Sequence, residues 1–469
     1  MTSPPATSAP ARGRGGILGP AYLATTIAVF ALIAFNAFEA MAVTTVMPTI
    51  SRDLDGIGLY ALAFAAPLAS GVVGMVAAGA WSDRRGPAVP LLVSLVLFSI
   101  GVLTCGLAPS MEVLVAGRVV QGLGTGALIV SLYVVVGVVY PGALQPSIFA
   151  SFAAAWVLPS LFGPGLAALV ADAFGWRWVF LGVVALVVLA AALLAPVVPS
   201  LRKAAVADGE PASRSRLAWA VVAAVMVLAV ELLGSTFALA AAPAIVLVLV
   251  AVRPLTPRGT LVARRGLPSV IGTRGLMSAA FFCGQAYIVL VLQQRWDLSA
   301  GQAGIALTVV GVVWASASQL QARLRNHLTS ERAMLIGTLM LLGGGILMWV
   351  VVWQHWSAWL AGGAFVFAGA GMGLGFTRTG VAMLAASSDA DRGFNSSALS
   401  IADSLGAALA LSLCGIGFTA ATAAGRDPFL AVFGVGILCA VGAVVTAART
   451  PCQPAATDNP VVSRPQGPG

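Results

Sequence analysis

Three ionisable side chains, Glu39, Arg118 and Asp403, lie within long apolar runs of the sequence. Glu39 is near the middle of its run, Arg118 is in the outer part of its run, and Asp403 is two to three turns into its run. An ionisable group at the centre of a membrane-spanning helix costs about 2.5–3.5 kcal/mol on insertion scales, so each needs a partner or a function. A carboxyl group placed there can take a proton from one side of a membrane and release it to the other. We therefore predict that Glu39, Asp403 and Arg118 couple protons, with Arg118 pairing either with Glu39 or with a cargo molecule.

Each of these side chains also has a purely structural explanation. Glu39, with Asn36 one turn earlier on the same helix face, can stay neutral and tie helices together by hydrogen bonds. Arg118 can form a fixed structural ion pair, and Asp403 can be a solvated residue or part of a gate.

Bulky or polar residues interrupt helices that otherwise consist of small apolar side chains. An apolar pocket with a few polar groups suits lipophilic compounds. The residues predicted on this basis to contact cargo are Asn36, Trp156, Gln285, Tyr287, Trp314 and Glu231. Aromatic side chains in such helices also pack or face lipid, and Glu231 and Arg378 lie near predicted helix ends, from which they can extend to the membrane interface.

The sequence offers little for enzymatic or metal chemistry. The five cysteines show no paired or metal-ligand spacing, and His327 and His355 fall in predicted loops. The glycines that follow Arg118 come after no predicted strand, so they do not form a nucleotide-binding loop. We expect no cofactor, no metal and no enzymatic activity, and an ion gradient rather than ATP as the source of energy.

The composition indicates which solvent surrounds these residues. Of the 469 residues, 59% are hydrophobic and 9% are charged, whereas soluble domains average about 25% charged residues. The mean hydropathy is +0.98. Apolar runs of about 20 residues recur, each long enough to cross a bilayer core of about 30 Å as a helix. The fold class is therefore an all-α polytopic membrane protein.

The apolar runs predict fourteen membrane-spanning helices. Their ranges are 20–47, 59–80, 88–108, 113–139, 147–171, 177–198, 217–233, 236–252, 268–294, 301–322, 333–353, 357–384, 394–421 and 428–448. The seventh and eighth runs are short and are joined only by Gly234 and Ser235, so they either cross the membrane or dip into it as a hairpin. We favour crossing.

The basic residues orient the chain in its membrane. With the N-terminus in the cytoplasm, 19 of the 25 Lys and Arg residues fall on the cytoplasmic side, four lie outside and two lie within spans. This bias follows the positive-inside rule and explains the net charge of +9 without a nucleic-acid partner. The first 19 residues lack the apolar core and cleavage site of a signal peptide. A composition rich in Arg, Ala, Gly and Val suggests a bacterial inner membrane, with both termini cytoplasmic.

The chain divides into two halves around a basic centre. The predicted parts are a disordered tail at 1–19, a six-helix bundle at 20–198, a linker with two extra helices at 199–267, a second six-helix bundle at 268–448 and a disordered tail at 449–469. Alternate glycines occur in both halves, at positions 122, 124 and 126 and at positions 369, 371, 373 and 375. Such glycines let helix backbones approach closely, and two parallel repeats around a midplane site are a known transporter plan.

Two motifs in the first half resemble signatures of the major facilitator superfamily. The segment Gly79–Gly86, between the second and third predicted helices, resembles its cytoplasmic loop signature, although Pro87 and Ala88 replace the usual basic pair. The segment Arg118–Gly124 resembles its helix 4 signature.

Three further motifs narrow this resemblance. Gly163-Pro164 is similar to the antiporter motif of exporters in this superfamily, with Pro159 in place of a preceding glycine. Glu39, nine residues before Pro48, is similar to the acidic helix 1 motif of fourteen-helix drug:proton antiporters, with Glu in place of the usual Asp. The Trp-Arg-Trp run at 176–178 also resembles that subfamily.

The resemblance implies a major facilitator fold of two six-helix bundles plus two linker helices. It implies a proton-coupled antiporter that exports small lipophilic compounds, drugs or a natural product, by alternating access and as a monomer in the lipid bilayer. It implies gating or conformational roles for Gly79, Asp83, Arg84, Gly86, Gln121, Gly122, Gly163 and Pro164. Because a fold does not fix a cargo, an exporter or importer of a lipid or another metabolite stays open as an alternative.

Overall fold

All regular structure that the computed structural model describes is helical. It describes residues 16–450 apart from 142–143, 197, 204–213, 235–237, 325–326 and 389–390, so the predicted tails lie almost entirely outside the described residues. The helices are α1 (Leu23–Asp53), α2 (Tyr60–Arg85), α3 (Ala88–Gly106), α4 (Met111–Val139), α5 (Gln145–Phe174), α6 (Arg177–Leu194), α7 (Val198–Lys203), α8 (Arg214–Gly234), α9 (Ala242–Val252), α10 (Leu267–Trp296), α11 (Ala300–Arg323), α12 (Ser330–Trp353), α13 (Ala358–Ala385), α14 (Arg392–Ala423) and α15 (Pro428–Ala447).

Thirteen of the described helices are long and apolar enough to cross a membrane. The predicted span 236–252 is the exception. Its α-helical part, α9, has 11 residues and is about 16 Å long, against a bilayer core of about 30 Å. Pro243 lies in the first turn of α9, where a helix needs no hydrogen-bond donor, and a 3₁₀ turn, Ala238–Ala241, precedes the helix. The α-helical part alone does not cross the bilayer core, but the 3₁₀ turns Ala238–Ala241 and Arg253–Leu255 continue it on both sides. The crossing that we favour therefore stays a prediction.

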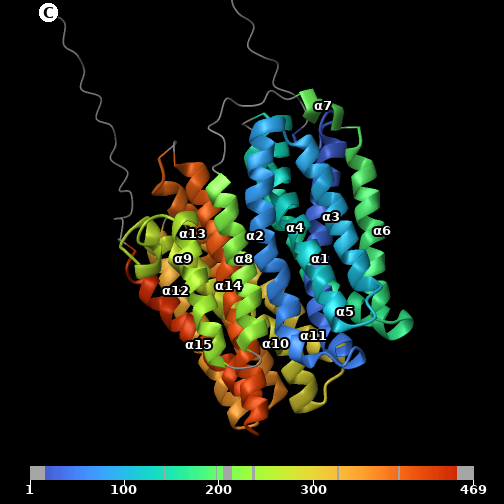
Figure 1. Ribbon diagram of the computed structural model, residues 1–469. Coiled ribbons are helices and arrows are strands. Elements are labelled where there is room, and N and C mark those ends of the chain that lie inside the picture. The colour runs from blue at the N-terminus through green and yellow to red at the C-terminus, as the bar shows by residue number, and fades with distance from the viewer. Residues whose placement is uncertain are drawn as a thin grey trace, which may run out of the picture. The chain divides into compact units, whose positions relative to one another are not determined.

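The described helices form two compact units. The first unit comprises Met1–Leu228 and Leu298–Thr308, and the second comprises Ala229–Asp297 and Val309–Gly469. In Figure 1 the long helices of each unit run alongside one another. The sequence boundaries 20–198, 199–267 and 268–448 stay predictions.

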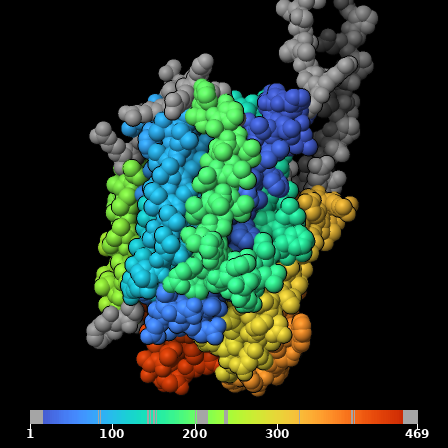
Figure 2. Space-filling model, turned by 90° about the vertical axis from the view of Figure 1, so that its right-hand side faces the viewer, coloured from blue at the N-terminus to red at the C-terminus, as the bar shows by residue number. Residues whose placement is uncertain are grey.

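Glycines of α4 set the packing of the first unit. Helix α4 contacts both α2 and α3, and a Cβ atom at Gly122 or Gly126 would overlap the α2 backbone, while one at Gly124 would overlap α3 at Phe98. The alternate glycines therefore allow the close approach that the sequence predicts. Helix α6 covers another part of this unit, where it lies between α1 and α3 (Figure 2).

In the second unit, glycines of α13 allow the same close approach of helices. A Cβ atom at Gly371 would overlap α12, and one at Gly373 would overlap α11 at the Trp314 carbonyl. Helix α10 packs against α14 and α15, and α12 packs against α13. Gly275 of α10 and Gly406 of α14 lie directly against each other. This contact brings together two helices that carry charged side chains, Arg274 directly before Gly275 and Asp403 one turn before Gly406.

The Trp-Arg-Trp run fixes the start of α6. Gly175, at φ 92°, ends α5 in a conformation that favours glycine. Trp176 Nε1 donates to Asp53 Oδ2 at 3.0 Å, and the Arg177 guanidinium lies 4.3 Å from the centre of the Trp176 ring. Arg177 also donates to the Ala108 carbonyl at 3.1 Å. The run therefore ties α6 to the ends of α1 and α3.

Candidate functional site

Glu39 and Arg118 form a buried ion pair in the first unit. Glu39 lies about halfway along α1, and Arg118 Nη1 reaches its Oε1 atom from α4 at 2.5 Å. Only 5% of the Glu39 side chain and 6% of the Arg118 side chain are exposed. Burial of two charges is costly unless further hydrogen bonds compensate it. The other contacts of the pair therefore matter for its stability.

Two uncharged acceptors also hold Arg118. Its Nε atom donates to the Ala63 carbonyl of α2 at 3.0 Å, and its Nη1 atom donates to Gln121 Oε1 at 2.8 Å. Gln121 lies one turn beyond Arg118 on the same face of α4. The guanidinium thus has two acceptors besides the Glu39 carboxylate.

The Gly163-Pro164 motif of α5 contacts the α1 turn that carries Glu39. A Cβ atom at Gly163 would lie 3.4 Å from Met41 Cβ and 3.6 Å from Phe38 Cδ2. Pro164 lies inside α5 and cannot donate a helical hydrogen bond. The predicted conformational motif and the predicted proton-coupling acid therefore lie on facing helices.

A cavity of about 110 Å³ opens beside this region, between α1, α4 and α5. Two of the predicted cargo-contacting residues, Asn36 and Trp156, line it together with Tyr133, Phe152 and five Leu or Ile side chains. Asn36 lies one turn before Glu39 on α1. The structure thus brings these two predicted residues into one cavity next to the ion pair.

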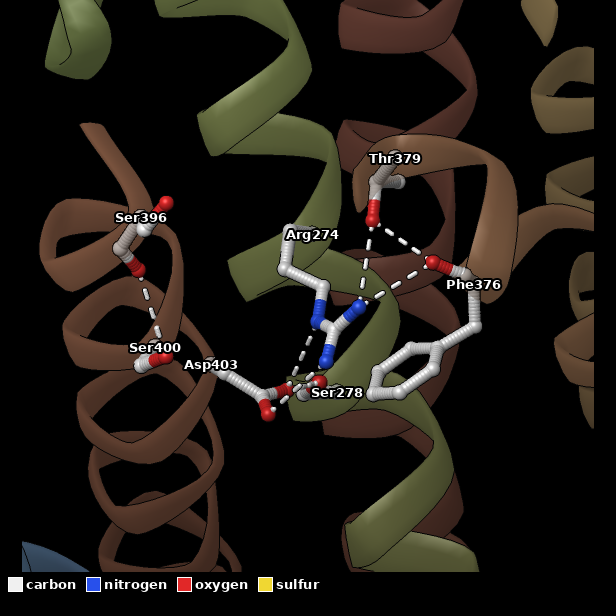
Figure 3. Close-up of polar contacts among 7 residues, drawn as sticks. All are labelled: Arg274, Ser278, Phe376, Thr379, Ser396, Ser400 and Asp403. Atoms are coloured by element: carbon white, nitrogen blue, oxygen red, sulfur yellow. Dashed lines mark hydrogen bonds and ion pairs between the residues drawn. The ribbon is translucent and has the colours of Figure 1, made fainter. Parts of the chain in front are cut away.

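Asp403 forms a second, more open ion pair in the second unit (Figure 3). Arg274 of α10 lies with Nε 3.3 Å from Asp403 Oδ1 and donates from Nη2 to Oδ2 at 3.3 Å. Ser278 Oγ also donates to Oδ1. The Asp403 side chain is 26% exposed and that of Arg274 is 16% exposed. These distances are long for charge-assisted hydrogen bonds, which span about 2.7–2.9 Å.

Arg274 is also held from α13. Its Nη1 atom donates to the Phe376 carbonyl at 3.0 Å and to Thr379 Oγ1 at 3.2 Å. Its guanidinium lies 3.2 Å from the centre of the Phe376 ring. Figure 3 shows the two side chains next to each other. On the α14 side, Ser396, Ser400 and Asp403 follow one helix face in the same view.

Sequence reasoning missed Arg274 as a site residue, because it was counted with the cytoplasmic loop charges. The signal was present. The predicted span began at residue 268, which already placed Arg274 inside the helix, and α10 begins at Leu267.

The other cargo candidates of the second unit lie in two kinds of surroundings. The Trp314 ring packs edge to face against Phe281 at 5.0 Å and against Phe376 at 5.4 Å, measured between ring centres. Phe376 is the ring on which the Arg274 guanidinium lies. Tyr287 is buried with its ring 5.6 Å from that of Phe418. Gln285 is buried in the same helix, α10. All three stay candidates for cargo contact.

Two charges that we expected near the membrane interface are buried. Glu231 in α8 is 2% exposed, and Arg378 in α13 is 7% exposed. Arg378 Nη2 donates to the Gln321 carbonyl of α11 at 2.6 Å. Extension to the membrane interface would expose these side chains, so it explains the position of neither Glu231 nor Arg378. Sequence position alone placed them wrongly, because it does not show which helix face packs against a neighbour.

The predicted gating loop is a tight turn between α2 and α3. Helix α2 contains Gly79, and the chain leaves it at Gly86, whose φ of 76° favours glycine. Arg84 is exposed. The Asp83 side chain lies outside the described residues. A latch role for Asp83 and Arg84 therefore stays a prediction.

Among the described residues, no group of three or more His, Cys, Asp or Glu side chains could hold a metal ion. The two charge clusters, Glu39 with Arg118 and Asp403 with Arg274, have similar arrangements. Each joins an acid to an arginine that has further partners on a neighbouring helix.

Known proteins resemble this chain over parts of its length. A probable multidrug-efflux transporter of Mycobacterium tuberculosis (strain CDC 1551 / Oshkosh) is 32% identical over 176 residues, which cover 38% of this chain and 37% of that protein. Multidrug resistance protein 3 of Bacillus subtilis (strain 168) is 32% identical over 148 residues, which cover 32% of this chain and 29% of that protein. The chain thus spans about a third of the length of the curated relatives that it matches.

Solved structures share the fold over most of the chain. The crystal structure of a POT family transporter in complex with 5-aminolevulinic acid has a TM-score of 0.67 at 14% identity, covering 90% of this chain and 94% of that one. The crystal structure of a D-xylose-proton symporter has a TM-score of 0.61 at 16% identity, covering 90% and 96%. At these identities the likeness concerns the fold alone. The family model of the Major Facilitator Superfamily matches residues 29–411. The chain therefore belongs to the Major Facilitator Superfamily of membrane transporters.

Proposed function

We propose that this chain is a proton-coupled antiporter that exports small lipophilic compounds by alternating access. The observation that carries the proposal is the buried Glu39–Arg118 pair, in which the arginine keeps two uncharged acceptors. A relative that is called a probable multidrug-efflux transporter supports export as the direction. We place the protein in a bacterial inner membrane as a monomer with both termini in the cytoplasm.

Protonation of Glu39 is the proposed coupling step. The carboxylate takes a proton and becomes neutral, which removes most of its attraction for Arg118. Arg118 then stays on α2 and α4 through Ala63 and Gln121. The centre of helix α1 is thereby released from α4. Gly163 of α5 lies against this turn of α1 and has no side chain that would obstruct a movement of α1. Loss of the proton restores the ion pair and the earlier arrangement.

Asp403 is the proposed second coupling acid. Its partial exposure lets water reach it, and its long contacts with Arg274 are easier to break than the short contact in the first unit. Residues of the α2–α3 turn, with Gly122 and Pro164, have proposed roles in the conformational change rather than in cargo contact.

A lipid or another metabolite is the alternative cargo. The specific observation in its favour is the cavity at Asn36, whose lining is apolar apart from that amide and the Tyr133 hydroxyl. Such a lining suits many lipophilic molecules. Import on the same scaffold would differ from export in the direction of movement relative to protons.

Transport in proteoliposomes of known orientation tests this proposal. An imposed proton gradient should drive a lipophilic dye in the direction opposite to the protons, and a protonophore should abolish this movement. Glu39→Gln should abolish it as well, whereas Arg323→Ala, a change at an exposed helix end, should not. Movement in the same direction as the protons would contradict antiport and support import.

A further inference from the structure

The cavity between α1, α4 and α5 has a lining that selects by charge. Its described lining contains no charged side chain. Three aromatic side chains, Tyr133, Phe152 and Trp156, form part of its wall, and the rings of Tyr133 and Phe152 lie 5.8 Å apart. Phe152 and Trp156 are one turn apart on α5, so both rings leave the same helix face.

Among the residues that the structure describes, none that lines this cavity offers a free carboxylate to a cationic cargo. Glu39 is one turn from Asn36, but Arg118 already holds it, and the Glu39 side chain is almost fully buried. A cation that enters an apolar cavity without a counter-ion pays a large desolvation cost. The cavity therefore disfavours a positive charge.

In the second unit, the partly exposed acid Asp403 is also already paired with residues of the chain. Arg274 and Ser278 both engage Asp403, and the Arg274 guanidinium lies on the Phe376 ring (Figure 3). An aromatic face with a carboxylate beside it is the arrangement that attracts organic cations. Here a residue of the chain itself occupies that arrangement.

Asn36 supplies the main polar contact in the cavity. Its side-chain amide has no hydrogen-bond partner among the described residues, and it carries both donors and an acceptor. In an apolar pocket, one such group fixes the orientation of a ligand. The volume of about 110 Å³ is somewhat below the roughly 150 Å³ of an apolar cavity that holds benzene. One aromatic ring fills most of it, and a larger ligand extends past Trp156 and Tyr133, which are exposed.

We propose that this cavity binds the uncharged aromatic end of the cargo through a hydrogen bond to Asn36, so that the transporter selects neutral aromatic molecules over organic cations. The inference rests on the proposed export function, whose site it specifies. It also gives Asn36 a role in specificity that is separate from the proton step at Glu39.

Binding of three two-ring probes to the full chain in lipid nanodiscs tests this proposal, with the signal of empty nanodiscs subtracted. Quinoline is neutral and accepts a hydrogen bond, naphthalene is neutral and accepts none, and N-methylquinolinium is a cation. Quinoline should bind at least about tenfold more tightly than N-methylquinolinium. Asn36→Leu should weaken quinoline binding up to about tenfold and leave naphthalene binding within about twofold.

Three variants complete the design. Asn36→Asp should reverse the preference towards N-methylquinolinium, because it adds the missing counter-ion. Trp156→Leu should weaken both neutral probes, whereas Trp178→Leu, at an exposed tryptophan of α6 outside the cavity lining, should not. A gain of cation binding in Asn36→Asp also shows that a variant at this position is folded.

Two results would overturn the inference: equal or tighter binding of the cation to the natural chain, or quinoline binding that is absent or unchanged in Asn36→Leu. Both leave proton-driven export intact, because the proteoliposome experiment tests export independently. Conversely, failure of a proton gradient to move any compound would contradict export without changing the order of probe affinities.

Discussion

The two units hold their charge pairs differently. In the first unit Glu39 and Arg118 are at most 6% exposed and meet at 2.5 Å, whereas in the second unit Asp403 and Arg274 are 26% and 16% exposed and meet at 3.3 Å. The first helix of the first unit carries the acid, while the first helix of the second bundle, α10, carries the arginine. An acid in a spanning helix therefore does not by itself define a role. Its burial and the partners of its arginine distinguish an insulated pair from one that water can reach.

The largest expected effect is the loss of an arginine from the buried pair. Arg118→Met leaves Glu39 as an uncompensated buried acid, and breaking a buried pair costs about 3–5 kcal/mol. Arg274→Met in the more open pair should cost less, about 1–3 kcal/mol, because the partly exposed Asp403 keeps contact with water. Unfolding in nanodiscs measures both losses of stability.

A double variant sharpens this contrast. Glu39→Gln should restore part of the stability of Arg118→Met, because it removes the charge that has lost its partner. Asp403→Asn should restore little in Arg274→Met. Equal losses for the two arginine variants would contradict the distinction between an insulated pair and an open pair.

Alternate glycines allow a comparison in which the units should behave alike. Gly126→Ala in α4 and Gly373→Ala in α13 place a Cβ atom into a neighbouring backbone or side chain, and such overpacking costs about 1–3 kcal/mol. Gly137→Ala and Gly380→Ala lie on the same two helices where nothing is within 4 Å. These two should stabilise by about 0.5–1 kcal/mol, because alanine favours the helix.

The sign of the change decides the comparison, and thermal unfolding of the four variants reports it. Destabilisation by all four would mean that the helices tolerate no added methyl group anywhere. Neutral effects at Gly126 and Gly373 would mean that the close helix contacts are not tight.

The smallest expected effect is that of Asp403→Asn. Arg274 keeps the Phe376 carbonyl, Thr379 and the Phe376 ring, so stability should change by less than about 1 kcal/mol. Transport driven by a proton gradient should fall but persist. A complete loss of coupled transport, with normal stability, would transfer the main coupling role to the second unit.

The sequence predicted the helical class and most spans, because apolar runs of membrane length leave the chain few alternatives. It also singled out Glu39 and Arg118, because each is costly in an apolar helix. It could not predict that Gln121 and Ala63 hold Arg118, since both contacts depend on how α2 and α4 pack.

Side-chain direction was the main obstacle elsewhere. Glu231 and Arg378 are buried because of the helix face that they occupy, which distance from a helix end does not reveal. The span at 236–252 stays a prediction, because its α-helical part starts only at Ala242 and 3₁₀ turns continue the helical run on both sides.

The most direct test of the central claim is proton release from the purified protein in weakly buffered solution when a lipophilic compound is added. The natural chain should release protons, Glu39→Gln should release none while it still binds the compound, and Asp403→Asn should retain a reduced release. Undiminished release from Glu39→Gln would contradict the assignment of coupling to the insulated pair of the first unit.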